Sequence, residues 1–362
     1  MSDSSQRGRM GLCLAGGGIT GAMFEVGCLA AIEESVEGFR ASDFDVYVGA
    51  ASGATIATAL AGGLPALRLY RALLDPADIF FPLKRNHLMR FDFDEWRRVF
   101  ATALSAARRF AQSVSSRPLE TDVWNELDRF WDSLPAGAFG LDAYDAFLAD
   151  FMARRGIPDR FDAMPKTLRI VAYDLDTGER VLFGDSEHAH VPVSRAACAS
   201  SAIPILFAPV RIDGRDYVDG GLGDLAHADV ADALGCDFVL VVNPVVAVHV
   251  SPHSRAVPTG HGKMPRVRDK GLLWVYHQSS RIRLHERFAA GLDRFRAERS
   301  GTELVLLEPD GSDATMFMHS PMNFAARREI LALGYKSTIA MLRDDASPLR
   351  RALVRRGLTP RA

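Results

Sequence analysis

Residues Asp45–Ala57 organise the rest of the chain, and they read Asp-Val-Tyr-Val-Gly-Ala-Ala-Ser-Gly-Ala-Thr-Ile-Ala. Valine and tyrosine favour a short strand after the aspartate, and the run from Ala54 has the apolar spacing of a helix. Gly49 and Gly53 bracket Ala51 with the spacing of a nucleophile elbow, G-x-S-x-G, whose central residue sits on a tight turn between strand and helix. The sequence therefore predicts an elbow in which alanine replaces the usual serine.

A second glycine-rich turn precedes the elbow. Gly11–Ala15 is an apolar run typical of a buried strand, and Gly16–Gly21 (Gly-Gly-Gly-Ile-Thr-Gly) follows it and opens a helix. A glycine turn in this position presents backbone N–H groups to an anion. The six residues also match the dinucleotide fingerprint G-x-G-x-x-G, but the supporting acidic residue should end the second strand, whereas Asp43 and Asp45 precede it. Nucleotide binding is therefore the weaker interpretation.

Length and composition limit the classes of function. The chain has 362 residues, 48% of them hydrophobic, which suits a large α/β domain and argues against global disorder. A net charge of −2 argues against a nucleic-acid partner bound through a broad basic face. The first ten residues are polar and hold no signal-peptide core, and the four cysteines lack metal-ligand spacing. We expect a cytoplasmic protein with reduced, buried thiols.

Helical patterns such as Trp96–Phe110 dominate residues Leu64–Pro165, where strand signals are few. We expect a helical insertion between the second and third strands. Within it, Ile79–Arg90 mixes bulky apolar residues with basic ones. Two interpretations stay open for this segment: core packing with cationic side chains that reach the solvent, or contact with an anionic lipid surface and the cover of an acyl pocket.

Strands and helices alternate again after the insertion. Asp219 closes a strand, and Gly220 and Gly221 follow it and free the backbone. We expect a long helix near Ile282–Arg299 and a frayed basic tail from Arg350. Further strands are expected at Leu168–Asp174, Arg180–Phe183, Phe238–Pro244 and Glu303–Pro309, and further helices at Tyr144–Met152, Ser194–Ala202 and Phe324–Leu342.

Four motifs in this order resemble the patatin-like phospholipase family: Gly16-Gly17-Gly18-x-x-Gly21, Gly49-x-Ala51-x-Gly53, Ser200-x-Ala202-Ile203-Pro204 and Asp219-Gly220-Gly221. The resemblance implies an α/β fold, a three-layer α/β/α sandwich with a mainly parallel central sheet and a helical insertion. It also implies a single patatin-like domain over residues 1–362. In that domain 11–244 form the motif-bearing core, 64–165 the insertion, and 245–362 a C-terminal extension that completes the fold.

The same resemblance implies the chemistry. Members of the family hydrolyse acyl esters of lipids with a Ser–Asp dyad and without a metal or cofactor. The nucleophile position falls on Ala51, the general base on Asp219, and the oxyanion hole on Gly16, Gly17 and Gly18. The supporting glycines are Gly21, Gly49, Gly53, Gly220 and Gly221. The implied partner is a lipid or acyl ester, with a peripheral membrane contact as an option and the oligomeric state left open.

Two positions depart from the family pattern. The family usually carries Arg or Lys where this chain has Thr20, which bears on head-group preference more than on reaction type. Ala51 has no nucleophilic atom, so no acyl-enzyme can form through it. Ser52 is a poor substitute, because an elbow centred on it would have alanines in place of both glycines. Its side chain would also be turned by about 100° round the new helix.

Two explanations of Ala51 remain. One is a natural, non-catalytic member of the family, and the other is a deliberate Ser→Ala substitution in an active hydrolase. The intact glycine bracket and Asp219 favour the substitution. The sequence thus predicts a lipid acyl hydrolase disarmed at its nucleophile, with a non-catalytic lipid- or acyl-binding protein as the alternative.

Overall fold

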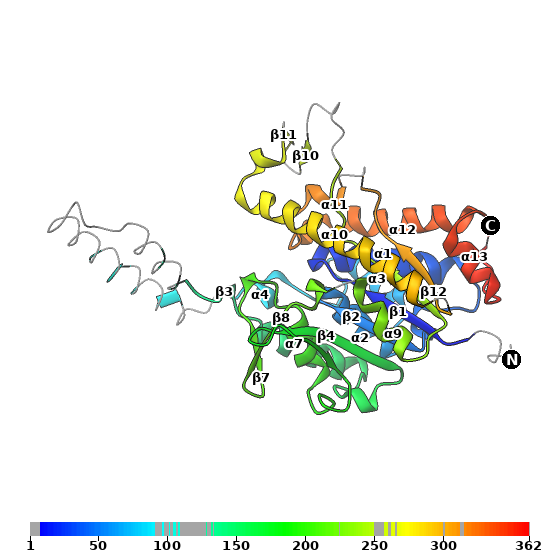
Figure 1. Cartoon of the computed structure of the whole chain (residues 1–362), viewed down its shortest axis with the longest axis horizontal. Helices are drawn as coiled ribbons and strands as arrows, with labels where there is room; N and C mark the ends of the chain where they lie inside the picture. Colours follow the sequence, from blue (N-terminus) through cyan, green and yellow to red (C-terminus); the bar gives the residue numbers. More distant parts are fainter. Residues whose placement is uncertain are drawn as a thin grey trace.

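An eight-stranded, mostly parallel sheet forms the centre of the computed structural model (Figure 1). Its strand order is β12-β9-β1-β2-β4-β8-β7, and β5 pairs with β4. β12, β9, β1, β2 and β4 run parallel, whereas β5, β7 and β8 pair antiparallel with their neighbours. The bounds are β1 (Met10–Leu14), β2 (Val46–Ala50), β4 (Thr167–Asp174), β5 (Arg180–Phe183), β7 (Val210–Ile212), β8 (Arg215–Val218), β9 (Phe238–Val242) and β12 (Glu303–Leu307).

The structure describes residues 8–90, 134–223, 225–249, 257–259, 262–264, 266–299, 301–311 and 315–361, with scattered positions between 96 and 132. The helix expected at Trp96–Phe110 lies mostly outside these residues. Within them, no helix is both long enough and apolar enough to cross a membrane. The helices are α1 (Gly18–Ser35), α2 (Ser52–Ala61), α3 (Ala66–Leu74), α4 (Arg85–Leu88), α7 (Asp142–Arg155), α8 (Val193–Ser200), α9 (Ala228–Ala233), α10 (Leu272–Glu298), α11 (Thr315–Met318), α12 (Arg327–Arg343) and α13 (Pro348–Arg355).

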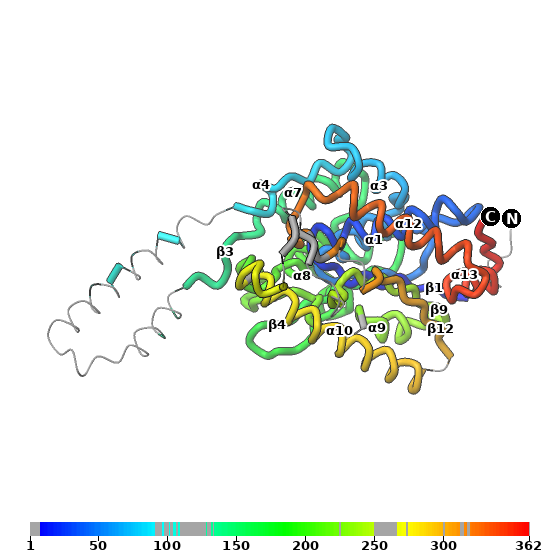
Figure 2. The backbone as a smooth tube through the Cα atoms, turned by 90° about the horizontal axis from the view of Figure 1, so that it is seen from above, coloured from blue at the N-terminus to red at the C-terminus, as the bar shows by residue number. Residues whose placement is uncertain are grey.

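The sheet separates two apolar cores, because successive strand residues point to opposite faces. Leu12 and Leu14 of β1 join the core that contains α1, α2, α3 and α12, whereas Cys13 joins the core beneath α9 and α10. Figure 2 shows α1, α3 and α12 on one side of β1 and β9, with α9 and α10 on the other. The strands β1, β2 and β9 are buried along their whole length, which explains their uninterrupted apolar sequences. The predicted α/β/α sandwich is confirmed.

Short strands complete the described structure. β3 (Gly137–Phe139), inside the expected insertion, pairs with β6 (Ile205–Phe207), and β10 (Val257–Thr259) pairs with β11 (Gly262–Met264). The rest of the described insertion is mainly helical, with α3, α4 and α7. The four cysteines are free and buried, as expected.

The long helix expected near Ile282–Arg299 is confirmed as α10, which begins ten residues earlier, at Leu272. The expectation of a frayed tail was wrong. The tail from Arg350 does not fray, because α13 buries Leu349 and Leu353, which lie on one face of that helix. Beyond α13, the Arg361 N–H donates to the Ser35 carbonyl oxygen at 2.7 Å, so the end of the described chain is held against the end of α1.

Candidate active site

The elbow lies where β2 passes into α2, and its central residue has a strained backbone. Ala51 has φ 51° and ψ −132°, a conformation that a residue with a Cβ rarely adopts. The flanking glycines are required by space: a Cβ on Gly49 would lie 2.5 Å from the Ala54 Cα, and one on Gly53 would lie 2.6 Å from the Leu14 carbonyl oxygen. Such strain costs on the order of 1–3 kcal/mol and persists only where the surroundings impose it.

Two serines at the end of α8 impose this conformation. The Ala51 N–H donates to Ser200 Oγ at 2.9 Å, and Ser200 Oγ donates in turn to the Val171 carbonyl oxygen at 2.5 Å. Ser201 Oγ shares its single proton between the Ala51 carbonyl oxygen at 3.2 Å and the Ala197 carbonyl oxygen at 2.8 Å. Both sides of the strained residue are therefore tied to α8, 149 residues further along the chain for Ser200. The Ser200 motif was recognised in the sequence, but its role was not.

The glycine loop between β1 and α1 touches the elbow directly. Gly16, Gly17 and Gly18 have φ values of 82°, 102° and 72°, which only glycine adopts without strain. A Cβ on Gly16 would lie 2.6 Å from the Ala51 Cβ, so the two turns meet with no room for a side chain. A Cβ on Gly21 would lie 2.1 Å from the Gly16 carbonyl oxygen. The structure thus brings the two predicted glycine motifs together.

The N–H of Gly16, which the resemblance assigns to the oxyanion hole, donates to Glu25 Oε1 at 2.7 Å. The N–H groups of Gly17 and Gly18 make no hydrogen bond within the described ranges. Of the three glycines, Gly16 is thus the one whose N–H is bonded within the described ranges.

Glu25 was missed by the sequence analysis. It is fully buried in α1, and its Oε2 has no hydrogen-bond partner among the described residues. Burial raises the pKa of this carboxyl well above its ordinary value, against the opposing effect of the Gly16 N–H. Burial thus favours the neutral form of this carboxyl, whose Oε1 holds the Gly16 N–H. The sequence did contain a signal for Glu25, because this residue interrupts an apolar helical run. A carboxyl that is buried in such a run needs a specific hydrogen-bond partner.

Asp219 follows β8 and faces the elbow. Its Oδ1 accepts the Gly221 N–H at 2.5 Å, and its own N–H donates to the Ala202 carbonyl oxygen at 3.1 Å. A Cβ placed on Gly221 would lie 2.9 Å from Asp219 Oδ1 and 3.9 Å from the Ala51 Cβ. The carboxylate and the elbow side chain are thus no farther apart than the sum of these two distances. Burial raises the pKa of Asp219 to about 7, and the Gly221 N–H only partly offsets it.

A buried histidine supports the Asp219 loop. His227 Nε2 lies 2.8 Å from the Gly220 carbonyl oxygen, which can only accept, so Nε2 carries the proton. Its Nδ1 lies 3.5 Å from Arg180, which is paired with Asp229. The backbone φ of His227 is 58°. No local pattern pointed to this residue, because its role depends on a turn seven residues earlier.

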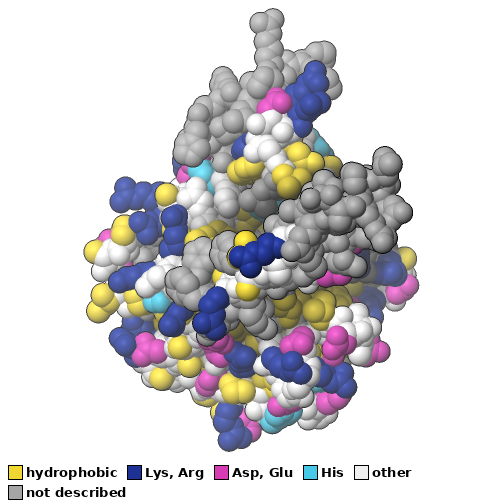
Figure 3. Space-filling model, turned by 90° about the vertical axis from the view of Figure 1, so that its left-hand side faces the viewer, with side chains coloured by type: hydrophobic (Ala, Val, Ile, Leu, Met, Phe, Trp, Pro, Cys, Tyr) yellow, Lys and Arg dark blue, Asp and Glu magenta, His cyan; other side chains and the backbone are white. Residues whose placement is uncertain are grey.

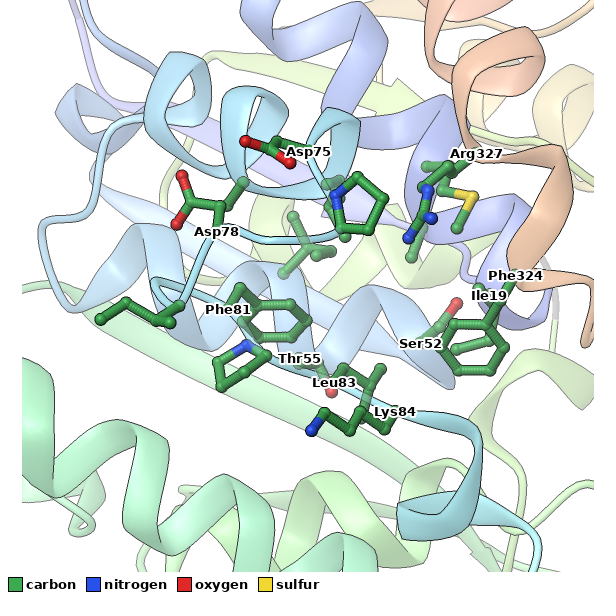
Figure 4. A pocket seen from close by; sticks show the side chains of 18 of the residues that line it. Ile19, Ser52, Thr55, Asp75, Asp78, Phe81, Leu83, Lys84, Phe324 and Arg327 are labelled. Atoms are coloured by element: carbon green, nitrogen blue, oxygen red, sulfur yellow. The ribbon is translucent and has the colours of Figure 1, made fainter.

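An apolar pocket of about 260 Å³ opens beside the elbow (Figure 4). Ser52 and Thr55 of α2 border it, together with Ile19 of α1 and the segment 75–84. The first part of the predicted segment Ile79–Arg90 therefore lines a pocket, up to Lys84, and Ser52 in the same lining is the residue next to Ala51. A second, smaller cavity has a volume of about 30 Å³. It is lined by Ala15, Ala50, Gly221, Gly223, Ala226, His227, Asn243, Val245, Leu284 and Phe288. Ala51 lines neither space, and it is 3% exposed.

Comparison with known proteins identifies the family. Residues 12–232 match the family model described as patatin-like phospholipase, which covers more than half of the chain. The chain therefore belongs to this family, whose members are lipid acyl hydrolases.

Individual relatives are distant. The uncharacterised protein YqhO of Bacillus subtilis (strain 168) is 25% identical over 218 residues, 58% of this chain and 62% of that protein. VipD from Legionella pneumophila has 15% identity and a TM-score of 0.40, covering 92% of this chain and 66% of its own. The type III effector ExoU of Pseudomonas aeruginosa has 15% identity and a TM-score of 0.37, covering 96% and 54%. This chain spans less than two thirds of the length of each of these proteins.

Proposed function

We propose that this chain is a lipid acyl hydrolase of the Ser–Asp type whose nucleophile position is occupied by Ala51. The observation that carries the proposal is the strained elbow: Ala51 keeps φ 51° although it has no atom that benefits from the strain. Strain of this kind clusters at active sites, where it presents a side chain to a substrate. Asp219, a carboxyl with a pKa raised to about 7, faces the same point.

A serine at position 51 would complete a reaction without a histidine. Ionised Asp219 would accept the serine Oγ proton while Oγ forms a bond to the ester carbonyl carbon. The carbonyl oxygen would become an oxyanion facing the N–H groups of Gly17 and Gly18. When the tetrahedral intermediate collapses, the bond to the alcohol breaks and the alcohol takes the proton from Asp219. Water, deprotonated by the same carboxylate, would then bond to the acyl carbon. The bond from that carbon to the serine Oγ breaks, Oγ takes the proton back from Asp219, and the fatty acid leaves.

Ser52 does not fit the nucleophile role. It is the first residue of α2 and borders the 260 Å³ pocket, whose lining does not include Asp219. Its Oγ is buried and has no hydrogen-bond partner among the described residues, so no base activates it. The intact elbow and Asp219 favour a Ser→Ala substitution in an active hydrolase over loss of the whole site.

The substrate we propose is a lipid or another acyl ester held in the pocket beside Ser52. Its apolar lining suits an acyl chain. Ile79 and Lys84 border this pocket and are exposed, and Figure 3 shows hydrophobic side chains among basic and acidic ones on one face of the molecule. This combination supports a peripheral contact with an anionic membrane. No cofactor is part of the proposal.

The decisive experiment restores the nucleophile. Ala51→Ser should hydrolyse short and long acyl esters, whereas the unmodified chain should not exceed background. Removing a nucleophile or base elsewhere costs about 10⁴–10⁶ in kcat, so the gain should span several orders of magnitude. Activity should rise with pH through about 7, because Asp219 must be ionised to accept the proton.

Two controls bound the result. Asp219→Asn in the Ala51→Ser background should remove most of the activity, because an amide cannot take the serine proton. Hydrolysis by the unmodified chain that is lost on Ser52→Ala would contradict the assignment and move the nucleophile by one residue. A folded Ala51→Ser protein that cleaves no ester would favour the second candidate, a non-catalytic lipid- or acyl-binding protein, for which the alanine itself is the supporting observation.

A further inference from the structure

The pocket beside the elbow is completed by residues beyond the family match. The match ends at residue 232, but Phe324 and Arg327 also line the pocket. Arg327 is the first residue of α12 and reaches toward the space that Ser52 and Leu83 border (Figure 4). The C-terminal part of this chain therefore supplies a cation to a cavity whose other walls come from the shared core and the segment 75–84.

The charge of Arg327 is not used inside the protein. The half-buried side chain makes no ion pair or hydrogen bond with any other described residue. Its position does not help α12 either, because the N-terminus of a helix is already positive and a cation there is unfavourable. A half-buried cation at the wall of an apolar pocket favours a ligand that carries the counter-charge.

The other charges around the pocket do not compensate Arg327. Asp78 is paired with Arg68, with N–O distances of 2.7 and 2.9 Å, and this pairing lowers its pKa. Asp75 and Lys84 are exposed and opposite in sign, so solvent screens both. Arg327 is the least exposed of the uncompensated charges in the lining. The pocket is thus apolar over most of its wall and positive at one side.

We propose that Arg327 binds the anionic group of a single-chain amphiphile whose acyl or alkyl chain occupies this pocket. The anion is a phosphate or a carboxylate, since the guanidinium can hold either with two parallel hydrogen bonds. Arg327 is then a specificity-determining residue for the occupant of this pocket. The inference rests on the proposed function only in assigning the occupant of this pocket as the substrate.

The first test uses the chain as it stands, because Ala51 prevents turnover and allows equilibrium binding. Octyl phosphate, octanoate, octyl phosphocholine and octyl glucoside are titrated below their aggregation concentrations by calorimetry. Octyl phosphate or octanoate should bind more tightly than the uncharged glucoside. Comparing the two anions shows whether a phosphate head group or a fatty-acid carboxylate is preferred.

The matched variants are Arg327→Gln and Arg328→Gln. Arg327→Gln should weaken binding of the anionic ligand by about tenfold to a hundredfold, because a hydrogen bond to a charged group contributes about 1.5–3 kcal/mol. It should leave octyl glucoside binding unchanged. Arg328 is exposed, so Arg328→Gln should change neither. Equal losses in both variants, or tighter binding of the zwitterionic phosphocholine than of either anion, would overturn the inference.

The second test separates this inference from the proposed function. In the Ala51→Ser background, Arg327→Gln should raise KM for an anionic ester more than it lowers kcat, and Arg327→Lys should restore part of the loss. If Ala51→Ser hydrolyses nothing but anion binding still depends on Arg327, the proposed function fails and the inference stands. If hydrolysis is restored but the preference for anionic esters does not depend on Arg327, the inference fails and the function stands.

Discussion

The glycine loop and the elbow are neighbouring strand-to-helix turns on β1 and β2, and they are built differently. The loop reaches positive φ at three consecutive glycines without strain, and one carboxyl, Glu25, fixes it. The elbow forces an alanine to φ 51°, and it is tied at both its N–H and its carbonyl by the hydroxyls of Ser200 and Ser201. Side chains from a distant helix thus hold the strained residue on both sides, whereas the glycines of the loop adopt positive φ without such a constraint.

Gly16→Ala tests how closely the two turns depend on each other and should have the largest effect. The added Cβ would lie 2.5 Å from the Ala50 carbonyl oxygen and 2.6 Å from the Ala51 Cβ, at a φ of 82°. Overpacking and backbone strain together should lower the free energy of unfolding by about 2–6 kcal/mol. Denaturant unfolding followed by circular dichroism measures this loss.

Gly178→Ala is the matched control. Gly178 has a similar φ of 72°, but an added Cβ there meets nothing within 4 Å. Only the backbone strain remains, so the loss should be about 1–2 kcal/mol. Equal losses at the two positions would show that contact between loop and elbow does not constrain Gly16.

The pH dependence of stability distinguishes Asp219 from an ordinary turn aspartate. Burial raises its pKa from 3.8 to about 7 in the folded protein, so the folded form keeps a proton that the unfolded form releases. The contribution of Asp219 to the free energy of unfolding is fully present below about pH 4. It is lost as the pH rises through about 7, and the loss is at most roughly 4 kcal/mol. Asp219→Asn should flatten the fall in unfolding free energy between these pH values. If the unfolding free energy of Asp219→Asn changed with pH as steeply as that of the unmodified chain, the raised pKa of Asp219 would be contradicted.

Ser200→Ala removes the tie on the N–H side of the elbow. The Ala51 N–H would be left buried without an acceptor, which costs about 1–3 kcal/mol of unfolding free energy. Ser201→Ala should cost less, because the Ala51 carbonyl still accepts from the Ala54 N–H at 3.0 Å. Thermal unfolding of the two variants side by side gives the order. A larger loss in Ser201→Ala would mean that the carbonyl side holds the strain.

Glu25→Gln should have the smallest effect and sharpens the view of the glycine loop. The amide oxygen can still accept the Gly16 N–H, and no charge is lost if Glu25 is already a neutral acid. The change in unfolding free energy at neutral pH should be within about 0.5 kcal/mol. Glu25→Ala, which removes the acceptor, should cost about 1–3 kcal/mol. A large loss in Glu25→Gln would show that the carboxylate is ionised.

The sequence predicted those parts of the fold and site that rest on local patterns. Glycine spacing and β-forming residues indicated both turns, because the residues that a tight strand-to-helix corner requires are neighbours in the sequence. The partners of these turns leave no such trace. Ser200 lies 149 residues from Ala51, whose N–H it accepts. The hydrogen bond from the Gly16 N–H to Glu25 depends on how α1 packs under the loop, and no sequence spacing indicates it. The proximity of Asp219 to Ala51 also rested on the resemblance and not on spacing.

The wrong expectation for the tail has a different cause. The segment after Arg350 is rich in arginine, and a charged terminal segment is typical of a solvated end. Leu349, Ala352 and Leu353 nevertheless lie at helical spacing and are buried in α13. Net charge describes the exposed face of an amphipathic helix and says nothing of its other face.

The position of β1 in the sheet has a consequence for anyone who prepares a shorter protein. β1 lies between β2 and β9, and both β9 and β12 follow the last residue matched by the family. A fragment ending at residue 232 would leave Met10–Leu14 as an open edge of five apolar residues, able to pair with the same edge of another molecule. The shortest version suited to expression therefore includes β12. Because Arg361 is bonded to Ser35, a purification tag on the C-terminal side should be joined through a flexible spacer.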